Sequence, residues 1–287
     1  MKEVLDIHKA PDMHWVGDGF PVRQLIAPGT ADGALDPFLM LDYAEPTDFK
    51  PTNKKRGVGQ HPHRGFETVT VVYQGELEHR DSTGAGGVIG PGDVQWMTAA
   101  GGILHEEFHS AAFAKSGGTM EMVQLWVNLP AKDKNAPPGY QTLIKKDIPS
   151  VELPGGAGHV RVIAGDYQGH NGPAHTFTPI NLWDVSLAAA KKTVLTIPNG
   201  HSTAIVVLRG VVNVNHTHAA HPEQLVVFSP TGNDITLEST GGALVLIMSG
   251  VPIKEPVAAH GPFVMNTIGE IKQAMLDFQN GKFGAIG

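Results

Sequence analysis

Two short segments carry potential metal ligands at every second position. His61 and His63 lie on either side of a proline, and His105 and Glu107 repeat the same spacing later in the chain. Because residues i and i+2 of a strand point to the same face, each pair would present both side chains to one side. The proline supports this geometry, since it biases the preceding residue toward extended conformations. Two such strands side by side would bring three imidazoles and one carboxylate to a common point.

This combination of ligands suits a borderline divalent metal. Neutral imidazole and carboxylate groups bind iron(II), manganese, nickel, copper and zinc. On an octahedral ion, four protein ligands leave two positions for a substrate and dioxygen, whereas on zinc they would close a tetrahedral site. The chain contains no cysteine, which excludes thiolate ligands, a thiolate nucleophile and disulfides.

Histidine spacing alone is weak evidence for a site. With 15 histidines in 287 residues, chance yields roughly one H-x-H pair. A further pair, His216 and His218, lies with His221 in the segment HTHAAHPEQ, which we expect to be an exposed polar loop rather than another metal site. The position in the second half that matches His61 offers only His201, so we expect no metal there.

The rest of the chain is patterned as short strands separated by turns. Hydrophobic residues make up 41% and charged residues 17%, as in soluble globular proteins, and 35 glycines and 21 prolines favour turns over long helices. The hairpin phrase TVTVVYQGELEHR in the first half resembles AIVVLRGVVNVN in the second. We therefore expect an all-β fold made of one barrel or sandwich repeated in tandem.

One helix and one linker interrupt this pattern. The segment NLPAKDKNAPPGYQ, with its three prolines, predicts the start of a linker between the halves. Thr267 and Glu270 form a capping-box pattern that predicts the beginning of a helix near the C-terminus. The apolar residues Ile268, Ile271, Met275 and Phe278 then recur at helical spacing before Gly281.

Charge and hydropathy exclude some classes of partner. The net charge is −7, and the longest basic run is Lys54–Arg56, which argues against direct nucleic-acid binding. The N-terminal residues lack the apolar core of a signal peptide, and the apolar stretch near Ala243 is too short to span a bilayer. We therefore expect a cytoplasmic protein without a membrane partner.

Several longer phrases together resemble the pirin family of bicupins. The resemblance is close over most of the first half and patchy in the second, and it implies two tandem cupin barrels (double-stranded β-helix, jelly-roll) with a C-terminal helix. A metal-binding barrel would occupy residues 1–135, and a metal-free barrel with the helix would occupy residues 136–287. The phrases are LDPFLMLDYAEP, HPHRGFETVT, PGDVQWMTA, GILHEE, QLWVNLP and HGPFVMNT.

The resemblance to pirins also implies a ligand set. His61, His63, His105 and Glu107 would hold one divalent metal, with iron(II) preferred over nickel, manganese, copper, cobalt or zinc. The general cupin pattern would instead recruit Glu67, whose parity suggests the same face as His61 and His63. We assign Glu107 as the ligand and Glu67 as a hydrogen-bond acceptor beside the ligands.

Other residues near these motifs have simpler expected roles. We expect His79 at the surface or the rim of the site. His109 stands where the general cupin pattern has asparagine, and we expect it in solvent, with a spare metal ligand or a pocket residue as the alternatives. Gln124 either lines the pocket or packs in the core, and Trp96 and Met97 belong to the barrel core.

The resemblance implies two functions that would use the same metal. Some bacterial pirins act as quercetin 2,3-dioxygenases, in which a flavonol and dioxygen react, the ring opens and carbon monoxide leaves; Glu107 would accept the proton of the 3-hydroxyl. Other pirins act as redox-sensitive regulators that contact a transcription factor or a metabolic enzyme. We favour the enzyme, and isomerisation of a small metabolite on the cupin scaffold is a weaker third possibility.

Overall fold

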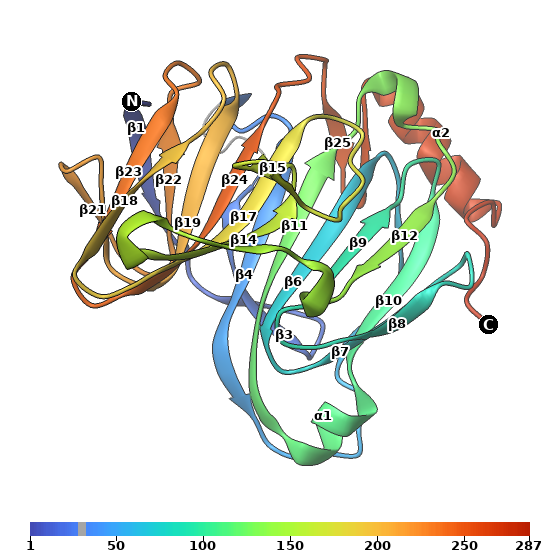
Figure 1. Cartoon of the computed structure of the whole chain (residues 1–287). Coiled ribbons are helices and arrows are strands. Elements are labelled where there is room, and N and C mark those ends of the chain that lie inside the picture. The colour runs from blue at the N-terminus through green and yellow to red at the C-terminus, as the bar shows by residue number, and fades with distance from the viewer. Residues whose placement is uncertain (28–32) are drawn as a thin grey trace. The chain divides into compact units, whose positions relative to one another are not determined.

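The computed structural model describes residues 1–27 and 33–287, and strands dominate this part of the chain (Figure 1). The chain divides into two compact units, each assembled from three separate segments. We call them the N-terminal barrel unit, comprising Asp12–Arg23, Phe38–Lys145 and Ile253–Gly287, and the C-terminal barrel unit, comprising Met1–Pro11, Gln24–Pro37 and Lys146–Pro252.

The N-terminal barrel unit is built mainly on two sheets. The larger sheet has the strand order β12-β9-β6-β11-β4-β3-β2, and the smaller has the order β5-β10-β7-β8. The strand pair β25-β26, two α-helices and a short 3₁₀ helix (labelled η) complete the described part of the unit. The elements are β2 (His14–Val16), β3 (Phe20–Ile26), β4 (Phe38–Phe49), β5 (Gly57–His63), β6 (Phe66–Gln74), β7 (Leu77–Asp81), β8 (Gly86–Ile89), β9 (Val94–Thr98), β10 (Ile103–His109), α1 (Ala111–Ser116), β11 (Gly118–Asn128), η2 (Ala131–Asp133), β12 (Gly139–Leu143), β25 (Ala258–His260), β26 (Phe263–Met265) and α2 (Ile268–Gln279).

The C-terminal barrel unit repeats this plan. Its larger sheet has the order β1-β22-β19-β24-β17-β14-β13, its smaller sheet has the order β18-β23-β20-β21, and β15 pairs with β16. The elements are β1 (Val4–Lys9), η3 (Lys145–Asp147), β13 (Ser150–Glu152), η4 (Pro154–Gly156), β14 (Gly158–Ala164), β15 (Asp166–Tyr167), β16 (His170–Asn171), β17 (Ile180–Leu187), β18 (Lys191–Thr196), β19 (Ser202–Gly210), β20 (Val212–Val214), β21 (His218–Ala220), β22 (Gln224–Phe228), β23 (Asp234–Ser239) and β24 (Ala243–Gly250).

Each unit has a hydrophobic core made by side chains at alternate strand positions. In the C-terminal barrel unit, Ile205 and Val207 of β19 pack with Val245 and Ile247 of β24 in one buried cluster. This alternation is the two-residue period of a strand whose inner face is dry. The predicted all-β fold with two cupin barrels and a terminal helix is confirmed.

The first residues of the chain belong to the C-terminal barrel unit, and the last residues belong to the N-terminal barrel unit. Strand β1 pairs with β22 of the C-terminal barrel unit over the register Val4–Phe228 to Lys9–Gln224. Helix α2 packs against β25 and β26 and belongs to the N-terminal barrel unit (Figure 1). The contiguous boundaries 1–135 and 136–287 therefore differ from the compact units, because strand pairing and helix packing join segments that are far apart in sequence.

The predicted linker is part of the N-terminal barrel unit. Within the segment 128–141, Lys134 is only 1% exposed. Strand β12 begins at Gly139 and pairs with β9 along the edge of the larger sheet. The prediction of a linker here was wrong, because the polar composition gave no sign that Lys134 is buried or that β12 forms the edge of a sheet.

The predicted capping box at the start of α2 is confirmed. The Thr267 side chain accepts a hydrogen bond from the Glu270 backbone, and the Glu270 carboxylate accepts one from the Thr267 backbone. The buried face differs from the expected stripe: Ile271 is buried with Ala274, whereas Ile268 is 63% exposed. No helix in the described ranges is long and apolar enough to cross a membrane.

Candidate metal centre

The four predicted ligands all lie on β5 and β10, which pair with each other in the smaller sheet. The antiparallel register sets His61 directly opposite His105. The register shifts between His105 and Glu107, so that Glu107 pairs with Val58 near the beginning of β5. The pairing of β5 with β10 therefore brings together two short motifs that are far apart in the sequence.

The three imidazole rings converge. One potential ligand nitrogen from each of His61, His63 and His105 lies within 4.8 Å of the other two. The ring centroids of His61 and His105 are 4.1 Å apart, and those of His63 and His105 are 4.7 Å apart. His63 and His105 are buried and His61 is half-buried. The structure thus gathers three side chains that could hold one metal ion.

Two of these rings are kept neutral by their surroundings. Burial lowers the pKa of His63 and of His105 well below the ordinary histidine value, and the neighbouring imidazoles lower it further. Nδ1 of His63 and Nε2 of His105 are buried and have no hydrogen-bond partner. Buried polar atoms are normally paired, and neutral imidazole nitrogens are good metal ligands, so these unpartnered nitrogens fit a site for a cation.

Hydrogen bonds hold two of the imidazole rings in place. Such contacts fix the orientation of a ligating ring and leave one nitrogen for the metal. The contacts are His61 Nδ1 to the Gly59 carbonyl at 2.8 Å and His105 Nδ1 to His79 Nε2 at 2.9 Å. The Pro262 carbonyl lies beside the His63 ring and raises the pKa of that imidazole.

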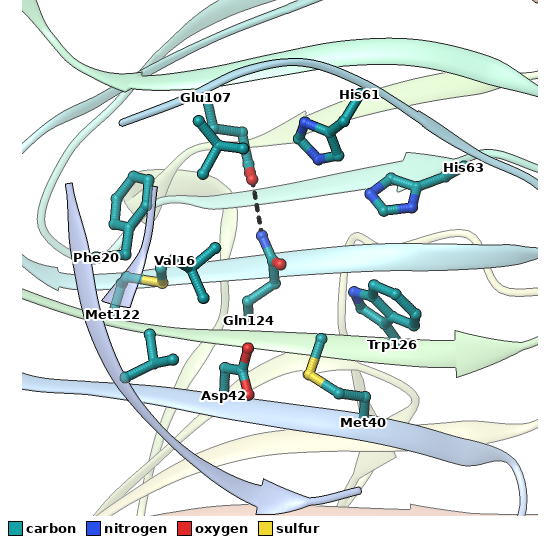
Figure 2. A pocket seen from close by; sticks show the side chains of 12 residues that line it. Val16, Phe20, Met40, Asp42, His61, His63, Glu107, Met122, Gln124 and Trp126 are labelled. Atoms are coloured by element: carbon teal, nitrogen blue, oxygen red, sulfur yellow. Dashed lines mark hydrogen bonds between the residues drawn. The ribbon is translucent and has the colours of Figure 1, made fainter. Parts of the chain in front are cut away.

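Glu107 lies in the same pocket as His61 and His63, with its carboxylate held by two donors. The Gln124 amide donates to Oε2 at 2.9 Å (Figure 2), and the Thr70 hydroxyl donates to Oε1 at 3.3 Å. Burial raises the pKa of Glu107, and the positive charge of a protonated His61 would oppose this. The group of nitrogens within 4.8 Å does not include Glu107, so its role as fourth ligand stays a prediction.

A cavity of about 300 Å³ opens beside these residues. Most of its wall is apolar. Among its polar groups, Gln124 and Asp42 are cross-strand partners on β11 and β4 of the larger sheet, and Glu107 faces Gln124 from β10 of the smaller sheet (Figure 2). Such a cavity suits a small, largely apolar ligand with a few polar groups. The lining residues are Val16, Phe20, Val22, Met40, Asp42, Val58, His61, His63, Glu107, Met122, Gln124 and Trp126.

Comparison with known proteins identifies the family. The family described as Pirin matches residues 19–127, and the Pirin C-terminal cupin domain matches residues 182–284. The chain belongs to the pirin family. It is 56% identical over 283 residues to a Pseudomonas aeruginosa protein named "Putative quercetin 2,3-dioxygenase PA2418", covering 99% of both chains.

Solved structures of relatives agree with this assignment. A crystal structure named quercetin 2,3-dioxygenase from Acinetobacter baumannii is 50% identical to this pirin, with a TM-score of 0.97 and coverage of 100% of both chains. A bacterial pirin from Escherichia coli, solved in complex with nickel(II), is 18% identical, with a TM-score of 0.63 and coverage of 86% of this chain and 100% of that one. The second comparison shows a shared fold.

In this pirin, Glu67 lies on the other side of the larger sheet from the metal centre. Thr70 points toward Glu107, so Glu67, three positions earlier on β6, points to the opposite face. Its carboxylate accepts a hydrogen bond from Thr98 at 2.7 Å instead. The predicted contact with the ligands was wrong, because Gly65 (φ +90°) interrupts the alternation between His63 and β6.

Two further histidines of this pirin are buried where we expected exposure. His79 is 1% exposed and contacts His105, and its ring stacks on Tyr140 with centroids 5.1 Å apart. His109 is 3% exposed, its Nε2 contacts the Gly19 carbonyl at 2.9 Å, and its ring packs against Phe49. The residues beside each histidine in the sequence did not indicate burial, because the contacts of His79 with His105 and of His109 with Gly19 join distant segments.

Several other residues singled out in the sequence of this pirin lie in the pocket, in the core or at the surface. Gln124 lines the pocket, and Trp96 and Met97 are fully buried, as expected. His216 and His218 are exposed, as predicted, but only His216 lies in a loop, because His218 begins strand β21 and pairs with Val214 of β20. Trp126 was missed as a pocket residue; its position at i+2 from Gln124 on one strand could have indicated it.

Proposed function

We propose that this pirin is a quercetin-type flavonol 2,3-dioxygenase with one mononuclear divalent metal. The observation that carries the proposal is the convergence of three imidazoles, two of them with unpartnered buried nitrogens, at one end of an apolar cavity. The relatives named for quercetin 2,3-dioxygenase support this choice of reaction. Iron(II) is our first choice of metal, and nickel(II), found with the Escherichia coli pirin, is the second.

The proposed centre uses His61, His63, His105 and Glu107 as ligands. A bound divalent ion would supply Lewis acidity that favours the deprotonated form of an enolic hydroxyl and, if redox-active, a route for electrons to dioxygen. The neutral imidazoles meet the charge requirement of such an ion, since they add no positive charge of their own. The Glu107 carboxylate completes the set and lowers the net charge of the centre.

The residues of the chain would bind and orient the flavonol. Trp126 and Met40 provide flat and flexible apolar surface for a planar ring system (Figure 2). Glu107 would accept the proton of the 3-hydroxyl at its carboxylate, while Gln124 holds that carboxylate toward the cavity. The cavity wall excludes water from the reacting ring, which limits side reactions.

Reconstitution tests this function directly. Metal-free protein is loaded separately with iron(II), nickel(II), manganese(II), cobalt(II), copper(II) or zinc(II), and quercetin absorbance, dioxygen uptake and carbon monoxide are measured together. We expect equal consumption of quercetin and dioxygen with at least one metal, and loss of this turnover in Glu107→Gln. The adjacent Glu106→Gln is the matched control and should keep activity. Metal binding without turnover of any flavonol would favour the regulatory function instead.

A further inference from the structure

Lys134 is a buried cation that lies close to the end of β5, the strand that carries His61 and His63. Its side chain is only 1% exposed, and its ammonium donates to three oxygens: the Gly65 carbonyl at 2.8 Å, Asn128 Oδ1 at 2.7 Å and the Val264 carbonyl at 3.0 Å. Burying an ammonium group is costly unless its donors are satisfied, and all three donors are used here. Two of the acceptors belong to segments about 200 residues apart in sequence.

These two segments meet directly after the ligand His63. The Arg64 amide donates to the Pro262 carbonyl at 3.2 Å, and the Val264 amide donates to the Arg64 carbonyl at 3.0 Å. A Cβ atom on Gly65 would lie 1.9 Å from the Val264 carbonyl oxygen, so only glycine permits this approach. The terminal segment is therefore fastened against the backbone that follows β5.

The same terminal segment contacts the ligand itself. The Pro262 carbonyl, which accepts from the amide of Arg64, the residue after His63, also lies beside the His63 ring, where it raises the pKa of that imidazole. If the terminal strand moved, this carbonyl would move with it, and His63 would lose the contact that orients its ring. A metal ligand without its outer partner typically binds the ion about 10- to 100-fold more weakly.

We infer that Lys134 is a positioning residue for the metal centre. Its ammonium ties Gly65 to Val264, and through this tie the Pro262 carbonyl holds the His63 ring in the orientation that ligation needs. The inference rests on the proposed metal site but not on the reaction performed there. A merely structural lysine would stabilise the fold without changing the affinity for the ion.

A second buried lysine provides a matched control. Lys2 is 0% exposed, and its ammonium also donates to three oxygens, the carbonyls of His201, Ser229 and Pro230 at 3.2, 3.4 and 2.8 Å. These residues all belong to the C-terminal barrel unit, whereas the proposed ligands belong to the N-terminal barrel unit. Lys2→Met and Lys134→Met therefore remove the same group from side chains that have almost no solvent exposure. Only the Lys134 ammonium contacts the segment that follows β5, the strand that carries His61 and His63.

The test measures the dissociation constant of cobalt(II) by competition with a chromophoric chelator, together with the visible spectrum of the bound cobalt. We expect Lys134→Met to raise the dissociation constant about tenfold and to alter the spectrum, while Lys2→Met leaves both within twofold of wild type. The melting temperature should fall in both variants. Equal dissociation constants and spectra in the two variants would overturn the inference.

A milder variant serves if Lys134→Met does not fold. Ser82 ties the terminal segment to β10, since its hydroxyl donates to the Phe283 carbonyl at 2.5 Å and accepts from the Leu104 amide at 3.1 Å. Ser82→Ala should raise the cobalt dissociation constant severalfold, and an unchanged constant would overturn the inference. Wild-type protein that binds no cobalt would overturn the proposed function and this inference together, whereas tight wild-type binding isolates the inference.

Discussion

His61 and His105 are direct cross-strand partners of β5 and β10, and their ring centroids lie 4.1 Å apart. Cross-strand neighbours in a sheet have side chains on the same face and close enough to touch. Two imidazoles in this position would repel each other if both were protonated, and burial keeps His105 neutral. Sheet pairing thus brings two separated motifs into position to share one cation.

Removal of His105 should abolish tight metal binding. His105 is fully buried, and its centroid lies within 4.7 Å of both other imidazoles. We expect His105→Ala to raise the cobalt(II) dissociation constant by more than about 100-fold, since loss of an outer partner alone gives about 10- to 100-fold. Isothermal titration measures this. His216→Ala, on an exposed loop, is the control and should bind as wild type does.

Gln124 should matter for turnover more than for metal binding. Gln124→Leu removes the donor that holds Glu107 at 2.9 Å, and we expect kcat on quercetin to fall about 10- to 100-fold through misorientation of the carboxylate. The chain contains a matched pair, in which Gln74 donates to Glu121, also at 2.9 Å. Gln74→Leu should leave kcat nearly unchanged, and equal losses in the two variants would contradict a role specific to Glu107.

Asp42 should select for hydroxyl groups on the substrate. It lines the cavity and pairs across the strands with Gln124, so its carboxylate offers a hydrogen-bond acceptor at the cavity wall opposite Glu107 (Figure 2). We expect Asp42→Asn to raise KM for quercetin about tenfold, since hydrogen bonds to charged groups are worth about 1.5–3 kcal/mol. KM for a flavonol without catechol hydroxyls should stay the same. Equal changes for both flavonols would exclude this role.

Glu67 should make folding stability depend on pH. Burial raises the pKa of Glu67 from 4.5 to about 7, so between these values the folded state holds a proton that the unfolded state has lost. The free energy of unfolding should therefore fall as pH rises from about 4.5 to 7, by at most about 3 kcal/mol, and then level off.

Glu67→Gln isolates this effect, because the amide keeps the shape and cannot ionise. Denaturant unfolding of both proteins at pH 5 and pH 8 is the measurement. We expect the stability difference between wild type and Glu67→Gln to change by a few kcal/mol between these pH values. A difference that does not depend on pH would show that Glu67 has the same pKa in the folded and unfolded states.

Local sequence patterns were sufficient where the determining interactions are local. The alternation in His61–His63 and the reciprocal hydrogen bonds of Thr267 and Glu270 involve residues at most three positions apart. The period of a strand and the geometry of a helix end follow from backbone conformation alone. The family resemblance then supplied the connection between the two ligand motifs, which their spacing could not.

Long-range contacts decided the remaining features, and the tertiary structure was needed to see them. The face of Glu67 depends on a glycine that breaks the strand alternation, and the burial of His79 and Lys134 depends on strands and segments that pair from distant parts of the chain. Long-range pairing and packing also place β1 in the C-terminal barrel unit and α2 in the N-terminal barrel unit. Residue type and spacing describe what a side chain can do, but sheet pairing determines which other side chains it meets.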